Sequence, residues 1–182
     1  MLKILKKVKK GKMNKILVFI ICLVVVFSTA FIGSLFTMGN TNSAWYQNNR
    51  PAITPPNFVF PIVWNILFFL IALSLYFAWI SGKKSRKIVA LLFGVNLALN
   101  MLWSYLFFSL QLPFYAFIEF ILLWLSILAI FILGFKIDKK VSWLILPYLL
   151  WVSFAGILNW LFAFWWLFSS IIKFKSQSSC KI

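Results

Sequence analysis

The chain has 182 residues, of which 64% are hydrophobic and only 11% are charged, whereas a soluble domain carries roughly a quarter charged residues. There is too little polar surface to cover a soluble globule, so that class of protein is excluded. Lys and Arg number 18 against two acids, and His is absent. The absence of His excludes Ser-His and Cys-His catalytic sites and His-ligated zinc. Cys22 and Cys180 form no metal or disulfide pattern, so we expect no metal site and no required cofactor.

Five apolar stretches are long enough to cross a bilayer, which takes about 20 residues. They predict an all-α membrane protein, a bundle of five transmembrane helices. Pro113 suits the first turn of the fourth helix, and Pro147 is expected in the first turns of the fifth. The expected spans are residues 16–37, 57–80, 88–110, 113–135 and 142–168. The expected organisation is a basic N-terminal segment (1–15), a five-helix domain (16–168) and a polar C-terminal tail (169–182).

Basic residues are distributed unevenly between the two ends of this bundle. Seven lie before the first span, four in the second connection and three in the fourth, against Arg50 and three in the tail on the opposite side. The positive-inside rule then places the N-terminus in the cytoplasm and the C-terminus outside. The composition favours a bacterial membrane, inner or outer, over an organelle. The N-terminal lysines would attract anionic lipid headgroups, so we expect lipids as partners and no nucleic acid.

The basic start of the chain also has features of a cleavable leader. Ser28-Thr29-Ala30 follows the first apolar stretch, as small residues do at a signal cleavage site. The apolar run continues past Ala30, which is longer than a usual leader core. We therefore interpret the stretch as the first span, with cleavage near Ala30 as the alternative.

The segment 45–64 reads WYQNNRPAITPPNFVFPIVW. It resembles the translocator protein family, also called tryptophan-rich sensory proteins or peripheral-type benzodiazepine receptors, whose pattern here is WY, a short spacer, KP, then PP and F-x-P-x-W. Residues 96–104 and 147–159 are similar to the family's third and fifth helices. The chain departs from the pattern in a spacer one residue shorter, in Arg50 where Lys is usual and in Ile53 where Trp is frequent.

The resemblance, to a bacterial-type member, implies a five-helix membrane protein that is often dimeric. Family members bind porphyrins and haem, benzodiazepine-type ligands and, in animals, sterols. Light-dependent porphyrin breakdown is attributed to some bacterial members. The tryptophans that match Trp64 and Trp151 contact the ligand in the family and are implicated in that chemistry. A sterol-type Lys or Arg is missing shortly after Tyr148, so we do not expect a sterol.

One face of the third predicted helix carries two amides and two aromatic rings. At about 100° per residue, Asn100 lies about 40°, Trp103 about −20° and Phe107 about 20° from Asn96. Amides that face lipid would be unpaired, so this stripe should face the bundle interior. Two interpretations fit: interhelical hydrogen bonds, or a wall that contacts a ligand.

The second and fifth helices carry similar faces, so we predict one cavity with aromatic walls and a few amides. Such a cavity suits a large, flat, mostly apolar ligand. The first connection is expected to cover its outer mouth as a lid. Other tryptophans, at 79, 143, 165 and 166, are interpreted as interfacial. The candidate ligand-binding residues are Tyr46, Trp64, Phe68, Asn96, Asn100, Trp103, Trp151 and Ala155, with Trp64 and Trp151 also the candidate catalytic residues.

Two further features of the spans leave alternatives open. Glu119 is the only acid inside an apolar span; because such an acid costs about 2.5–3.5 kcal/mol, it serves either a structural or interfacial purpose or a ligand or proton function. Gly94 and Ala98 lie opposite the amide stripe as a pair of small residues. This face packs either within the bundle or against a second copy in a homodimer.

Three functions follow as candidates. The first is a carrier, scavenger or sensor that binds porphyrin or haem-type tetrapyrroles, without iron ligation because there is no His. The second is a light-dependent porphyrin-degrading enzyme that uses the indoles of Trp64 and Trp151. The third is a structural membrane protein with no saturable ligand.

Overall fold

The computed structural model describes the backbone of residues 14–179 and the side chains of residues 14–168. Throughout this part of the chain the secondary structure is helical, without strands. The long helices are α1 (Lys15–Thr37), α3 (Val59–Ser81), α4 (Arg86–Ser104), α5 (Pro113–Ile137) and α6 (Lys139–Ser179). The first connection holds a 3-10 turn, η2 (Asn40–Asn42), and a short helix, α2 (Ala44–Asn49), and a π-helical turn, η3 (Tyr105–Ser109), extends α4.

Five of these helical segments are long and apolar enough to cross a membrane, which confirms the predicted fold class. The last helix starts earlier than expected, so Pro147 lies inside it and not in its first turns. The reason is a cap at Asp138, whose carboxylate accepts the backbone N–H of Lys140 at 3.0 Å. An Asp at this position satisfies backbone donors that have no helical partner.

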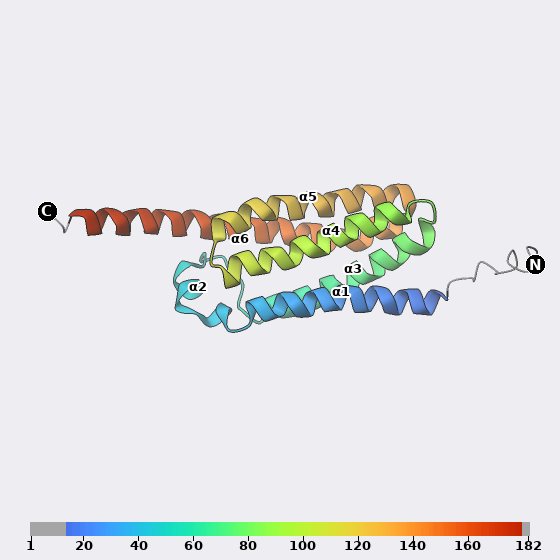
Figure 1. Ribbon diagram of the computed structural model, residues 1–182, viewed down its shortest axis with the longest axis horizontal. Coiled ribbons are helices and arrows are strands. Elements are labelled where there is room, and N and C mark those ends of the chain that lie inside the picture. The colour runs from blue at the N-terminus through green and yellow to red at the C-terminus, as the bar shows by residue number, and fades with distance from the viewer. Residues whose placement is uncertain (1–13, 180–182) are drawn as a thin grey trace, which may run out of the picture.

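The long helices form a closed ring. Each packs against two neighbours in the order α1, α3, α6, α5, α4 and back to α1. The basic connections α3–α4 and α5–α6 lie at the end where α1 begins (Figure 1), while α2 and the α4–α5 connection lie at the opposite end. The ribbon of α6 continues beyond the bundle at this second end.

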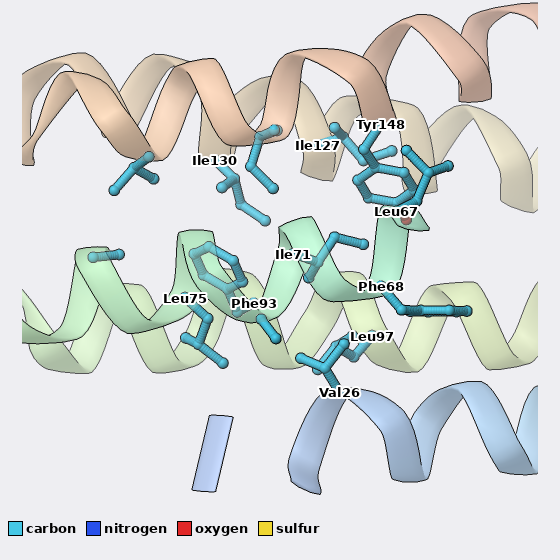
Figure 2. Close-up of a cluster of buried hydrophobic side chains, with 14 of the residues drawn as sticks. Val26, Leu67, Phe68, Ile71, Leu75, Phe93, Leu97, Ile127, Ile130 and Tyr148 are labelled. Carbon is cyan, nitrogen blue, oxygen red and sulfur yellow. The ribbon is translucent and has the colours of Figure 1, made fainter. Parts of the chain in front are cut away.

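The end of the helix bundle that is nearer the basic connections is filled with tightly packed side chains. Tyr148 of α6 is fully buried and its ring lies close to α3 residues such as Leu67 and Ile71 (Figure 2). Ile127 and Ile130 of α5 are at most 1% exposed and fill the same layer. Close packing of large apolar side chains therefore fills this end of the bundle among the described residues.

Candidate functional site

A cavity of about 760 Å³ occupies the end of the ring beneath the first connection. All five long helices contribute to its wall, together with Tyr46 of α2 and residues of the following loop. Its deepest lining residues include Phe68 of α3, Asn100 of α4 and Leu123 of α5. This volume lies in the range of pockets that enclose small organic ligands.

Aromatic rings form much of the wall. Trp64 and Phe68 lie one above the other on α3, with ring centroids 5.5 Å apart. Across the cavity, Trp103 stacks on Phe107 at 5.2 Å and an interplanar angle of 23°. Ring faces and edges at these separations provide flat apolar surfaces against which a planar molecule can stack.

The π-helical turn η3 places two consecutive phenylalanines in this wall. Consecutive helical residues, about 100° apart, can share a wall when they lie on either side of the inward direction, as Trp103 and Ser104 of α4 also do. The wider turn buries both side chains, at 4% and 7% exposure, and both line the cavity.

The short helix α2 covers the outer end of the cavity. Tyr46 is 7% exposed and packs on Phe108 and Phe162 at centroid distances of 5.8 and 5.9 Å. The hydroxyl of Ser43 caps this helix by accepting the backbone N–H of Tyr46 at 3.2 Å. Burial raises the pKa of the Tyr46 phenol, and the positive charge of Arg50 lowers it in part. The phenol is therefore neutral at physiological pH.

The polar groups of the wall are tied to neighbouring helices. Asn100 donates to the hydroxyl of Tyr148 at 3.2 Å. The indole N–H of Trp103 donates to Asn159 at 2.8 Å, and Asn159 in turn donates to the carbonyl of Pro113 at 3.1 Å. Because these bonds join α4, α5 and α6, they hold the aromatic rings in fixed positions.

The structure brings most of the sequence-predicted residues into one wall. Asn96 and Trp151 are not among the residues that line the cavity. The lining residues from the predicted set are Tyr46, Trp64, Phe68, Asn100, Trp103 and Ala155.

Asn96 lies one turn deeper along α4 than Asn100. Its amide donates to the hydroxyl of Ser126 at 2.9 Å, so this residue fits the interpretation of an interhelical hydrogen bond. Its carbonyl oxygen is buried with no hydrogen-bond partner. Contrary to the prediction, Asn96 does not line the cavity, because the cavity ends one turn before this residue.

Trp151 lies on the α3-facing side of α6, outside the cavity lining. Its ring packs edge-on against Phe60 at 6.0 Å and against Phe154 at 5.7 Å. Its indole N–H is buried with no hydrogen-bond partner. Since Phe60 itself lines the cavity, Trp151 stands directly behind the wall.

Sequence reasoning missed several lining residues. Phe108 was missed because a regular helical periodicity turns it away, and Phe120 because the face of α5 was judged only around Glu119. Arg50 and Thr54 lie in the connection, where no periodicity exists to indicate direction. All four line the cavity.

Glu119 is 6% exposed, so its side chain is buried within the bundle near the start of α5. Neither carboxyl oxygen has a hydrogen-bond partner, and the residue does not line the cavity. Gly94 and Ala98 are exposed on the outside of the ring, and a Cβ on Gly94 would meet nothing within 4 Å. The alternative that this face packs within the bundle is therefore wrong.

Comparison with known proteins agrees with this architecture. Residues 20–166 match the model of the TspO/MBR family. The chain belongs to this family. It is 37% identical to the tryptophan-rich protein TspO of Archaeoglobus fulgidus over 79% of this chain and 94% of that protein. It is 36% identical to the tryptophan-rich protein TspO of Chlorobaculum tepidum over 81% of this chain and 95% of that protein.

A more distant relative is animal. The translocator protein of Bos taurus is 28% identical over 71% of this chain and 79% of its own length. The protein is thus a multi-pass integral membrane protein of the TspO/MBR family. The match includes every residue that lines the cavity, so the cavity is formed entirely by the part of the chain that defines the family.

Proposed function

We propose that the protein binds a porphyrin or related tetrapyrrole in the cavity beneath α2 and acts as a carrier, scavenger or sensor. The observation that carries the proposal is the pair of indoles, Trp64 on α3 and Trp103 on α4, which line one cavity of about 760 Å³. A tetrapyrrole is broad, flat and mostly apolar, so stacking on indole and burial of its ring would supply affinity.

The fixed polar groups support the same ligand class. The amide of Asn100 and the hydroxyl of Ser104 line the cavity among a majority of apolar side chains. A few placed polar groups in an apolar pocket orient a ligand without making its entry costly. We infer no iron ligation, because the chain has no His.

We also propose the orientation of the protein. The basic connections lie at the end where α1 begins, and α2, whose Tyr46 lines the cavity, lies at the other end (Figure 1). By the positive-inside rule, the basic end and the N-terminus face the cytoplasm of a bacterial cell. The mouth of the cavity and the C-terminus are then outside.

The test is a tryptophan-fluorescence titration of the detergent-solubilised protein with protoporphyrin. The parent should show saturable quenching. Ala155→Phe should weaken binding at least about tenfold, because Ala155 lines the cavity and a phenyl group there fills part of it. Leu150→Phe is the control, since Leu150 is 62% exposed on the outside of α6. Quenching that rises linearly without saturation in the parent would leave only the structural-protein alternative.

A second candidate function is light-dependent breakdown of the bound porphyrin. It is favoured by the position of the Trp64 indole in the wall and of Trp151 behind it, because excited porphyrin can exchange an electron with a nearby indole. Illumination with substoichiometric protein should then bleach porphyrin faster than free porphyrin bleaches. Trp64→Phe and Trp151→Phe should slow the loss of absorbance, and an unchanged rate in the parent would exclude the enzyme.

A further inference from the structure

Arg50 is the one charged residue among the side chains that line the cavity in the described part of the chain. It follows directly after α2, and its backbone N–H closes that helix on the carbonyl of Tyr46 at 3.0 Å. Its side chain is exposed at the mouth. The guanidinium makes a long hydrogen bond to Asn57 of 3.4 Å, which leaves most of its donors available.

Within the described residues, no acidic side chain pairs with this guanidinium. The sequence has two acids only. Asp138 lies in the α5–α6 connection at the opposite end of the bundle, where it accepts from Ser81 at 3.0 Å. Glu119 has no hydrogen-bond partner for either oxygen. A cation at the rim of an apolar cavity, with neither Asp138 nor Glu119 paired to it, can pair with an anionic group of a ligand.

Other polar groups of the rim lie beside Arg50 in the same connection. The hydroxyl of Thr54 is buried with no hydrogen-bond partner, although the residue lines the cavity. Thr54 is held there by its backbone N–H, which donates to the carbonyl of Pro51 at 3.0 Å. A buried hydroxyl without a partner costs free energy that a ligand oxygen would recover.

We propose that the ligand is an acid, a flat apolar molecule whose carboxylate pairs with Arg50 and reaches the hydroxyl of Thr54 at the mouth. This inference rests on the proposed function and specifies the chemical class of the ligand. The apolar body then lies deeper, between Trp64 and Trp103. The arrangement follows from solvation, because a carboxylate moved into the apolar interior would lose its hydration without compensation. A guanidinium also matches a carboxylate geometrically through two parallel N–H donors.

The experiment compares protoporphyrin, a dicarboxylic acid, with its dimethyl ester, which has the same ring and no charge. Both are titrated by tryptophan quenching against the parent, Arg50→Gln, Arg50→Lys and Arg86→Gln. Arg86 is the matched control, because it carries the same charge at the other end of the bundle and packs over the ring of Trp79 at 5.4 Å. Circular dichroism during thermal unfolding shows whether each variant is folded.

The parent should bind the acid at least about tenfold more tightly than the ester, a typical effect of a charge-assisted hydrogen bond. Arg50→Gln should abolish this preference by weakening the acid alone. Arg50→Lys should retain part of it, and Arg86→Gln all of it. Loss of the preference in Arg86→Gln would overturn the proposal, since net charge would then be the cause.

The titrations distinguish a failure of this inference from a failure of the proposed function. If the parent binds acid and ester equally, the carboxylate is not recognised at Arg50, while tetrapyrrole binding stands. This comparison needs no variant, so equal binding would overturn the inference even if Arg50→Gln does not fold. If neither compound binds the parent saturably, tetrapyrrole binding itself fails.

Discussion

Glu119 places a carboxyl group inside the bundle, where no neighbour satisfies it. Both of its oxygens lack hydrogen-bond partners, and a buried polar group without a hydrogen bond costs free energy. On α5 it does not belong to the residues that line the cavity. The residue therefore lowers the stability of the bundle without contributing to the binding surface.

We expect Glu119→Met to raise the thermal stability of the solubilised protein by about 1–2 kcal/mol, because a side chain of similar length replaces two unpaired oxygens. Glu119→Gln retains polar atoms and should give a smaller gain. Thermal unfolding followed by circular dichroism measures both, and porphyrin affinity should stay within a few-fold of the parent. A large loss of affinity in both variants would instead assign Glu119 a ligand or proton function.

For single residues, the sequence predicts which side of a helix faces the bundle interior. It does not predict how far along the helix the cavity extends. Helical periodicity places Asn96, Asn100 and Trp103 on one inward stripe, and all three are at least partly buried. The cavity nevertheless ends between Asn100 and Asn96, since Ile71 and Ile127 from other helices fill the next layer. Where a cavity stops depends on side chains from the whole ring, which no single helix encodes.

The α4–α5 connection contains a strained residue. Gln111 has a φ of 52°, in the left-handed region that side chains with a Cβ adopt at a cost of about 1–2 kcal/mol. It follows the π-turn η3, and the next residue, Leu112, donates to the carbonyl of Leu106 at 3.0 Å. The strain is therefore part of the geometry that ends the helix and starts α5.

Gln111→Gly should stabilise the protein by about 1 kcal/mol, because glycine adopts positive φ without a steric penalty. Gln111→Ala is the matched control, since alanine keeps the Cβ and should bring no gain. Thermal unfolding under identical detergent conditions compares the two variants. Equal stability of the glycine and alanine variants would show that the backbone at this position carries no strain.

Individual elements differ in how well the sequence predicts them. The end of α1 and the start of α5 follow from apolar periodicity and from Pro113 at the first helical position. The π-turn does not, because its sequence, YLFFS, continues the apolar run of α4. The insertion of one extra residue per turn depends on packing against Tyr46 and Phe162, which are distant in the sequence.

At the scale of the molecule, hydropathy was sufficient to predict five spans but not their arrangement. Each of the spanning helices is apolar on most of its faces, so lipid-facing and buried sides cannot be separated from the sequence. The observed ring order, α1, α3, α6, α5, α4, depends on specific contacts such as the hydrogen bond from Ser74 to the carbonyl of Val141 at 3.1 Å. Such pairings join residues far apart in the chain.

The orientation in the membrane can be tested by labelling single cysteines in intact cells. In a Cys180→Ser background, with the buried Cys22 retained, we expect a cysteine at Ala52 to react with an impermeant maleimide. A cysteine at Ser85 should react only after the cells are permeabilised, because the positive-inside rule places the basic connection in the cytoplasm. The reverse pattern would invert the proposed orientation.

The outward face of α4 predicts self-association. Gly94 and Ala98 are exposed, and small residues let two helices approach closely in lipid. Gly94→Leu should therefore convert a dimer to a monomer in detergent and leave porphyrin affinity within a few-fold of the parent. Size-exclusion chromatography with light scattering measures the mass. Val95→Leu, about 100° around the same helix, is the control and should stay dimeric; a dimeric Gly94→Leu protein would place the interface elsewhere.

The tightly packed end of the helix bundle bears on whether small solutes can cross the membrane through the protein. Below Phe68 and Leu123 the space between the helices is filled, with Ile71, Ile127 and Tyr148 at most 1% exposed. The cavity therefore does not continue through the bundle toward the basic connections. We expect that the resting protein does not let small solutes leak across the bilayer along the axis of the bundle.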